Sequence, residues 1–217
     1  MSEKLYFFIK RVVDLVSGTL LAILFLPTSI IVAILIKTYD GGPIFADIPS
    51  RVGKNGKKFK LYKFRSMVEN AHKLLQTDPR YKKLYEKYKK GSFKLSIEED
   101  PRITPVGKFI RRHSIDEFPQ LINVLRGEMS LIGPRAYYPD ELEEQCQKFP
   151  KVKSLIKDVL SVKPGITGLW QVSGRNEINF DKRIELDAYY AKKKSLLLDL
   201  WILLKTPWIV IAGQGAI

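Results

Sequence analysis

The 217-residue sequence contains one cysteine, Cys146, and two histidines. A single cysteine excludes a disulfide within the chain, as is typical of a protein kept in the cytoplasm or exposed to it. So few cysteines and histidines also argue against a zinc site. Acidic residues are in the minority, because 23 Asp and Glu stand against 37 Lys and Arg, a formal net charge of +14. This excess favours anionic partners, which on charge alone include nucleic acid, anionic lipid headgroups and phosphorylated substrates.

Charged residues are absent from Leu15 to Ile36, a run of 22 residues. A straight helix of this length would extend about 33 Å, enough to cross the core of a bilayer. Pro27 near its middle favours a kink, and basic residues flank both ends, which opposes a simple crossing under the positive-inside tendency. Two alternatives stay open from these residues: a transmembrane helix with a tolerated proline, and a re-entrant helix that bends at Pro27 and returns.

A second apolar run extends from Ser195 to Gly213 near the C-terminus. Its tryptophans, Trp201 and Trp208, suit a helix that lies at the headgroup level of a membrane, although a core helix would also use them. The amphipathic stretch from Val106 to Ser114 is a candidate for the same interfacial plane.

Between these runs the sequence predicts a β-hairpin over Gly41–Met67, with its turn at Asn55-Gly56. Alternation along the second strand predicts that four residues share one face: Phe59, Leu61, Lys63 and Arg65. Two cations on that face could grip a phosphate, although a solvated sheet face is the ordinary interpretation. Helices are expected over 71–90, divided at Asp78-Pro79, and over 148–161 and 181–194. The glycine-rich segment 162–176 is expected to form a turn, a strand and a second turn.

The stretch from Arg111 to Arg135 places two adjacent carboxylates, Asp116 and Glu117, in strongly basic surroundings. Three interpretations compete: a helix cap, a solvated acidic pair, or a nucleophile with a metal ligand. Ser114 and Glu117 fit a capping box, and Asp116 as the cap would put Pro119 at the third helical position, where its missing N–H is harmless. On spacing alone, the cap is favoured.

The catalytic alternative uses the same residues differently. An ionised Asp116 beside Arg111, Arg112 and Arg135 could attack a phosphorus atom, and Glu117 could hold Mg²⁺.

Four segments, in this order, resemble the bacterial polyprenyl-phosphate sugar-1-phosphate transferases, the monotopic phosphoglycosyl transferases. They are KR-x-x-D at Lys10–Asp14, KFRSM at Lys63–Met67, IDEFPQLINVLRGEMSLIGPR at Ile115–Arg135, and KPGITGLWQVSGRN at Lys163–Asn176. The resemblance covers the chain from about Lys10 to the C-terminus. It implies an α/β, mostly helical, membrane-associated fold, with a re-entrant membrane helix over 1–40 and a catalytic domain over 41–217. That domain would contain the small hairpin and interfacial amphipathic helices, on the cytoplasmic face of the bacterial inner membrane.

The resemblance also implies a reaction. A sugar 1-phosphate passes from a UDP-sugar to a polyprenyl (undecaprenyl) phosphate and UMP is released, which initiates surface glycan assembly. By the motif match Asp116 is the nucleophile, which would carry the phosphosugar covalently, and Glu117 holds Mg²⁺. The substrate-binding residues implied by position are Lys63, Arg65, Arg111, Arg135, Gln171 and Arg175. The GLWQVSGRN residues of the glycine-rich segment are similar to those of relatives that transfer hexose phosphates, so the resemblance favours a hexose over an N-acetylated sugar. Membrane phospholipid is an expected partner and nucleic acid is not, and the oligomeric state stays open, a homodimer included.

Departures from the family pattern limit what the resemblance implies. Leu26 replaces a small polar residue before Pro27, GPIFADIPSRVG lacks the usual glutamine, and Ala136 replaces the proline after GPR. The long N-terminal extension of larger relatives is absent, as expected of a minimal or trimmed catalytic form. A rival hypothesis is a non-catalytic, membrane-bound scaffold that binds anions, in which Asp116 and Glu117 only cap a helix.

Overall fold

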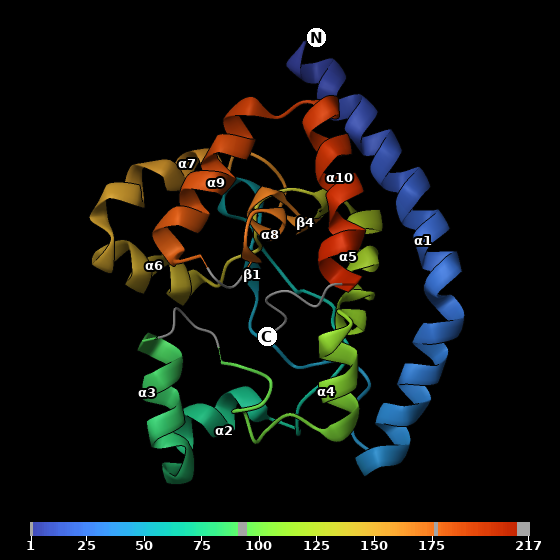
Figure 1. Ribbon diagram of the computed structural model, residues 1–217, viewed down its shortest axis with the longest axis vertical. Coiled ribbons are helices and arrows are strands. Elements are labelled where there is room, and N and C mark those ends of the chain that lie inside the picture. The colour runs from blue at the N-terminus through green and yellow to red at the C-terminus, as the bar shows by residue number, and fades with distance from the viewer. Residues whose placement is uncertain (1, 91–94, 176–177, 212–217) are drawn as a thin grey trace.

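The computed structural model describes residues 2–90, 95–175 and 178–211 and is mostly helical. Two small two-stranded sheets lie among the helices, one pairing β1 with β2 and the other β3 with β4. Figure 1 shows the helices arranged around these short strands, with α1 along one side of the molecule. The expected mostly helical fold with a small hairpin is confirmed.

Helix α1 (Glu3–Asp40) contains the apolar run and continues through Pro27 without a break in its helical assignment. The side chain of Ser2 accepts a hydrogen bond from Leu5 N at its start, and Gly41 ends it in the left-handed conformation, with φ 73°. Figure 1 shows that the helix curves along the molecule. Its most apolar window has a mean hydropathy of 2.7 and is 11% buried, so α1 is long and apolar enough to cross a membrane.

The predicted hairpin forms, with shorter strands than expected. β1 (Arg51–Val52) pairs antiparallel with β2 (Lys58–Phe59), and the one-turn η1 (Lys54–Gly56) joins them. Asn55 and Gly56 have φ of 58° and 76°, the left-handed values that a tight hairpin turn requires. Beyond β2 the chain runs on toward Phe64, whose N–H donates to the carbonyl oxygen of Asp116 at 2.9 Å. This bond fixes the KFRSM segment beside the acidic pair.

The packing of the second sheet explains why the segment 162–176 contains several glycines. β3 (Ser130–Ile132) runs parallel to β4 (Gly165–Thr167), with Ser130 opposite Gly165. A Cβ at Gly133, Gly165 or Gly168 would lie 2.4, 2.1 or 2.0 Å from a backbone atom of the segment packed against it. These glycines are therefore required by close backbone packing. The expected strand is present, but α8 (Leu169–Val172) follows it in place of a turn; Asn176, the last residue of the motif, lies outside the described residues.

The remaining helices surround this centre. Their bounds are α2 Ala71–Thr77, η2 Pro79–Tyr81, α3 Lys82–Lys90, α4 Pro105–Arg112, η3 Ile115–Glu117, α5 Gln120–Arg126, α6 Pro139–Lys148, η4 Pro150–Leu155, α7 Ile156–Val159, α9 Phe180–Lys193 and α10 Leu196–Ile211. The predicted division at Asp78-Pro79 is confirmed. The helix expected over 148–161 is divided between η4 and α7, and the one expected over 181–194 is α9.

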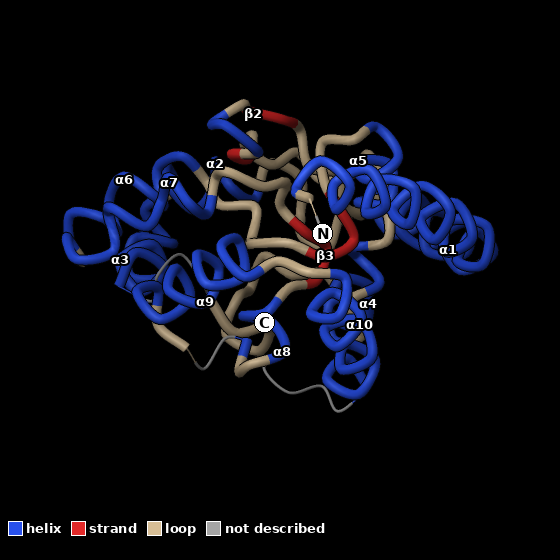
Figure 2. Tube along the Cα trace, turned by 90° about the horizontal axis from the view of Figure 1, so that it is seen from above, coloured by secondary structure: helices blue, strands red, loops and turns tan. Residues whose placement is uncertain are grey.

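Helix α10 combines the two roles considered for it. Ile202 is fully buried in the main hydrophobic core, whereas Trp208 and Leu197 are 76% and 81% exposed. In both Figure 1 and Figure 2, α1, α4 and α10 lie toward the same side of the molecule. All three helices carry exposed apolar side chains, among them Leu24 of α1 and Phe109 of α4.

Candidate active site

The acidic pair does not cap a helix. Asp116 and Glu117 lie in η3, where Ser114 has a φ of 55° and its side chain makes no capping hydrogen bond. Helix α5 begins after Pro119, and no side chain caps it. Both predicted capping registers are therefore wrong, and α5 begins later than either one placed it. Asp116 is 7% exposed, so a solvated pair is also wrong for that residue.

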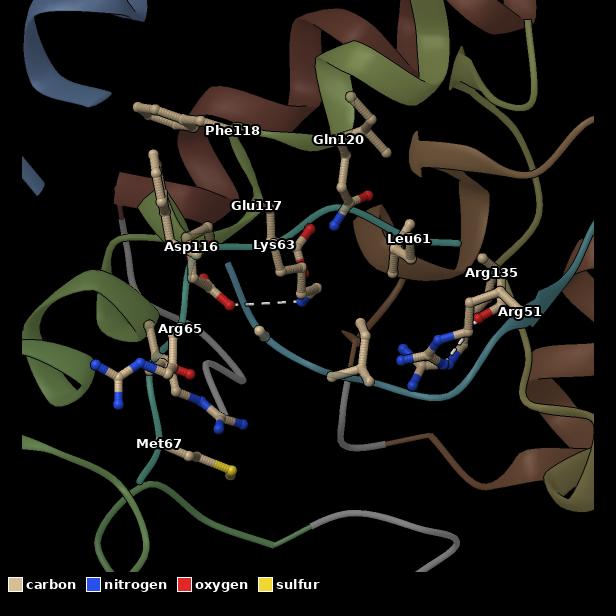
Figure 3. Close-up of a pocket in the computed structure, with 18 of the residues that line it drawn as sticks. Arg51, Leu61, Lys63, Arg65, Met67, Asp116, Glu117, Phe118, Gln120 and Arg135 are labelled. Carbon is tan, nitrogen blue, oxygen red and sulfur yellow. Dashed lines mark hydrogen bonds and ion pairs between the residues drawn. The ribbon is translucent and has the colours of Figure 1, made fainter. Parts of the chain in front are cut away.

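Lys63 is the closest cation to the pair. Its Nζ lies 2.6 Å from Oε1 of Glu117 and 3.5 Å from Oδ2 of Asp116, and Figure 3 shows all three side chains meeting. Leu61, Lys63 and Arg65 line this cavity as predicted, but Phe59 does not and Phe64 does. Because β2 ends at Phe59, the predicted strand alternation was wrong beyond that residue and does not account for the position of Lys63. A lysine from one motif thus neutralises part of the charge on carboxylates from another, 53 residues away.

The pair opens into a cavity of about 910 Å³. One part of its wall is apolar and comes from the exposed helices; it includes Leu21 and Phe25 of α1 with Leu203, Pro207 and Ile209 of α10. The other part is cationic; it includes Arg51, Lys63, Arg65, Arg111, Arg135 and Arg175. The cavity therefore combines an apolar volume with a concentration of positive charge around two carboxylates.

The predicted arginines meet at this cavity from separate elements. Arg111 comes from α4, and its charge acts on Asp116. Nη2 of Arg175 lies 3.4 Å from Oγ of Ser114, next to the acidic pair. Arg112, in contrast, is exposed and pairs with Glu98 at 2.5 Å, so it contributes to the surface and not to the cavity wall.

A buried network holds Arg135. The guanidinium lies 5.4 Å from the ring centre of Trp170, and its Nε lies 4.0 Å from Oε1 of Glu141. Glu141 is fully buried and also pairs with Arg183 at 3.2 Å. The backbone N–H of Arg135 donates to Asp187, 3.1 Å away. These contacts fix the direction of the arginine before any substrate is present.

Two predicted substrate-binding residues are engaged elsewhere in the protein. Arg65 lines the cavity, but its guanidinium pairs with Asp40 at the end of α1 and donates to the carbonyl oxygen of Pro43 at 2.6 Å. Gln171 donates to the carbonyl oxygen of Ile166 at 3.3 Å, and its Oε1 is buried without a hydrogen-bond partner within the described chain. Arg65 therefore secures α1, and Gln171 retains an acceptor at the cavity wall.

Sequence reasoning missed Arg51 as a cavity residue. It is 6% exposed, donates to the carbonyl oxygen of Ala136 at 3.0 Å and stacks 3.2 Å from the ring centre of Tyr138. Figure 3 shows it beside Arg135 on the wall away from the acidic pair. Its position at the start of the hairpin carried no signal of this role, because only the fold brings the hairpin to the Arg135 segment.

The whole chain matches known proteins. The family described as bacterial sugar transferase matches residues 5–213. The chain belongs to this family. It is 45% identical over 213 residues to the undecaprenyl-phosphate galactose phosphotransferase of Salmonella typhimurium, covering 96% of this chain but 42% of that protein. It is 40% identical to the exopolysaccharide production protein ExoY of Sinorhizobium fredii, covering 95% of this chain and 87% of that protein.

A third relative differs in the sugar that its name gives. The UDP-N-acetylgalactosamine-undecaprenyl-phosphate N-acetylgalactosaminephosphotransferase of Aeromonas hydrophila is 35% identical, over all of this chain and 47% of that protein. The chain thus spans less than half the length of two of these relatives, and it spans most of ExoY.

The two acids of the pair, Asp116 and Glu117, have opposite pKa shifts. Burial raises the pKa of Asp116, against the charge of Lys63 and in the same direction as the charge of Glu117. Burial acts on Glu117 too, but the charge and hydrogen bond of Lys63, with Arg135 and Arg175, hold its pKa below the ordinary value. Two neighbouring carboxylates with separated pKa values suit a division of roles.

The acidic pair also fits a divalent cation. Within the described residues no three His, Cys, Asp or Glu side chains form a group that could hold a metal ion. Mg²⁺ does not need such a group, because one or two carboxylates together with substrate phosphates commonly hold it. Glu117, whose pKa is lowered and whose side chain is 35% exposed, is suited to act as an ionised oxygen ligand at this cavity.

Proposed function

We propose that this protein transfers a sugar 1-phosphate from a UDP-sugar to a polyprenyl phosphate, with Asp116 as a covalent nucleophile. The observation that carries the proposal is that the carboxylates of the acidic pair line the cavity. Asp116 and Glu117 cap no helix and instead open into a cavity walled by cations. Buried carboxylates that serve no structural cap, among fixed phosphate-binding groups, are suited to phosphoryl chemistry.

The reaction proceeds in two displacements at one phosphorus atom. A carboxylate oxygen of Asp116 attacks the phosphorus that bears the sugar, and the bond from that phosphorus to the bridging oxygen breaks. UMP leaves with the electron pair of that bond, and an acyl phosphate that carries the sugar remains on Asp116. A phosphate oxygen of the polyprenyl phosphate then attacks the same phosphorus, which releases the carboxylate and forms a polyprenyl diphosphate sugar.

Fixed positive charge surrounds the position of this chemistry. Lys63 lies between the two carboxylates, while Arg111, Arg135 and Arg175 contribute from three other segments. Preorganised cations stabilise the charge that develops on phosphate oxygens in the transition state. Glu117 would hold Mg²⁺, which when bound supplies further positive charge against the diphosphate.

The lipid substrate fits the shape of the cavity. Its apolar wall comes from α1 and α10, the helices whose outer faces expose apolar side chains, and its cationic wall holds the acidic pair. A polyprenyl chain would lie along the apolar part, with its phosphate directed toward Asp116. The phosphate would thereby reach the nucleophile without entering hydrocarbon, where a charge is costly.

Contacts along α1 support a re-entrant position at the cytoplasmic face of the bacterial inner membrane. Near its start, Asp14 accepts hydrogen bonds from Oγ of Ser130 and N of Leu131, both at 2.9 Å. At its end, Asp40 pairs with Arg65. Both ends of the helix therefore contact the same body, which supports this position over one with the two ends on opposite sides of a bilayer.

The sugar is the finer part of the proposal. The relative named as a galactose phosphotransferase is 45% identical, against 35% for the one named for N-acetylgalactosamine, and this difference favours a hexose. A panel of UDP-sugars, with UMP release as the readout, tests the choice. Higher kcat/KM for UDP-N-acetylgalactosamine than for UDP-galactose would reverse it.

The covalent step has a direct test. Full-length protein in detergent with Mg²⁺ and a UDP-hexose alone should release about one UMP per enzyme, and intact mass spectrometry should detect a sugar phosphate on the protein. Adding polyprenyl phosphate should give turnover and remove the adduct, and EDTA should stop turnover. Asp158→Asn, at an exposed ion pair with Lys192, is the matched control and should behave as the wild type.

Two outcomes would refute parts of this scheme. If UMP appears only when both substrates are present, transfer is direct and no covalent intermediate forms. If no UDP-sugar gives UMP, and binding to any polyanion weakens steeply with salt, the protein is the anion-binding scaffold of the rival hypothesis.

A further inference from the structure

A second, smaller cavity of about 200 Å³ lies at the start of α1. Its lining shares no residue with the cavity of the acidic pair. Four cations line it, Lys10, Arg11, Lys54 and Lys163, while Asp14 is the one carboxylate in the lining. We call it the N-terminal pocket. The KR-x-x-D motif, to which the sequence assigned no role, supplies three of these residues.

Distant segments build this pocket. Lys54 comes from the turn of the hairpin, Ser130 from the start of β3, Lys163 from the connection before β4, and Tyr190 from α9. A Cβ placed on Gly127 would lie 3.4 Å from both Nη2 of Arg11 and Nζ of Lys163. Two cationic groups from opposite parts of the chain thus approach the same point. Folding brings these like charges together, although their repulsion opposes it.

Internal partners neutralise only part of this charge. Lys10 pairs with Asp199 at 2.8 Å. Arg11 donates to two carbonyl oxygens at the end of α5, Val124 O at 2.6 Å and Leu125 O at 2.9 Å, which carry no full negative charge.

The other two cations have no carboxylate within 4.0 Å in the described part of the chain. Lys54 instead lies 4.6 Å from the ring centre of Phe7, and Lys163 has no acidic side chain in contact. Burial, Arg11 and Lys54 lower the pKa of Lys163, and Asp14 opposes them. A bound anion would relieve this repulsion and complete the hydrogen bonding of both lysines.

We propose that the N-terminal pocket is a second anion site, which binds a phosphate monoester or diester through Lys54 and Lys163, with Arg11 beside them. Its volume is suited to a single phosphate group and not to a nucleotide sugar. The phosphate belongs to an anionic lipid headgroup or to a soluble phosphate compound. Leu5, Phe8 and Val12 are exposed on the same turns of α1, on the face away from the residues that line the pocket, so these turns also carry an apolar surface. The site is independent of the reaction at Asp116.

The first experiment observes the lysines themselves. In full-length protein in detergent, lysines are reductively methylated with ¹³C, and the signals of Lys54 and Lys163 are assigned with Lys54→Gln and Lys163→Gln. Inorganic phosphate should shift both signals saturably, while the signals of Lys151 and Lys153, exposed lysines of η4, should not saturate in the same range. Equal responses of all four signals would overturn the proposal.

The second experiment compares variants that change the net charge equally. Lys54→Gln with Lys163→Gln should lower phosphate affinity about tenfold or more, because hydrogen bonds to charged groups are lost; Lys151→Gln with Lys153→Gln should not. Both double variants should retain UMP release, which shows that they fold. Equal phosphate affinity in the two double variants would overturn the site.

Vesicles then identify the source of the phosphate. Selective loss of binding to phosphatidylglycerol vesicles, compared with phosphatidylcholine vesicles, in the pocket variant assigns the site to a lipid headgroup. Unchanged vesicle binding with lost phosphate affinity assigns it to a soluble phosphate compound.

Discussion

Two acidic pairs lie close to arginines in this protein, and they differ in what their oxygens contact. Glu141 and Asp187 are both fully buried; Arg183 pairs with Glu141 at 3.2 Å, and Tyr137 donates to Asp187 at 2.8 Å. Asp116 and Glu117 instead have Lys63 as their shared partner and open into the large cavity. Burial alone would rank the first pair higher as a functional site. The second pair is the candidate site because it lines the cavity.

The comparison also separates two uses of positive charge. Arg183 is 1% exposed and pairs with Glu141, a carboxylate that is fully buried and does not line the cavity. Arg135 shares the Trp170 ring with Arg183, at 5.4 and 5.0 Å, yet it reaches the cavity wall and acts on Glu117. The buried pair thus supports the arginine that the cavity pair requires. We expect variants of the cavity pair to change mainly activity, and variants of the buried pair to change mainly stability.

The largest effect is expected for Asp116→Asn. If Asp116 is the nucleophile, UMP release should fall by about 10⁶-fold, the loss found when a covalent nucleophile is removed. The melting temperature should change little, because the side chain supports no helix cap. Kinetics and thermal unfolding of the same preparation measure both. Retained turnover in a folded variant would show that Asp116 is not the nucleophile. It would also remove the proposed functional difference between the two pairs.

Glu141→Gln should act mainly on stability. It leaves Arg183 as a buried charge without an ionised partner, a change that costs about 3 kcal/mol. For a chain of this size each kcal/mol lowers the melting temperature by about 2 to 4 °C. Glu143→Gln, at an exposed position of the same helix, should be nearly neutral. Equal melting temperatures for the two variants would contradict the supporting role of the buried pair.

Lys63→Met should change the pH dependence of activity. Lys63 holds the pKa of Glu117 down, so removing this cation raises that pKa, and the acid limb of kcat/KM should move to higher pH. The rate at the optimum should also fall, by roughly a hundredfold to a thousandfold, the range of one electrostatic contact to developing charge. Lys60→Met, at an exposed neighbouring position, is the control. An unchanged acid limb would show that Lys63 does not control the ionisation of the acidic pair during the reaction.

Asp187→Asn should act on the pH dependence of stability. Burial raises the pKa of Asp187 to about 7, against hydrogen bonds from Tyr137 and Arg135. The folded state therefore binds a proton that the unfolded state, with an ordinary pKa near 4, releases earlier. Wild-type stability relative to Asp187→Asn should accordingly fall as pH rises from about 4 to 7. Melting temperatures of both proteins across that range measure the difference, and a parallel pair of curves would refute it.

Much of the fold was predictable from local patterns. The uncharged run predicted α1, Asn55-Gly56 predicted the hairpin turn, and Asp78-Pro79 predicted the division between α2 and η2. These predictions succeeded because backbone conformation at glycine, asparagine and proline depends on near neighbours. The cap at Ser114 or Asp116 was wrong because a long-range bond, from N of Phe64 to the carbonyl oxygen of Asp116, fixes η3 in another conformation.

The site was predictable in its members and not in their arrangement. Family resemblance supplied Asp116, Glu117, Lys63, Arg111, Arg135 and Arg175, and all of them line one cavity. It could not indicate that Arg65 pairs with Asp40, or that Arg51 joins Arg135. Pairing of side chains depends on which segments the packing brings together, and a single sequence does not contain that information.

The sequence by itself determined the basic charge, the apolar helix and the chemical groups present, because composition and local periodicity fix these directly. Tertiary structure alone decided which carboxylates face a cavity and which are enclosed by arginine and tyrosine. It also decided that the lysines of a hairpin turn and of a glycine-rich segment meet the start of α1. The physical reason is that hydrogen bonding and charge act over a few ångströms in space, whatever the distance along the chain.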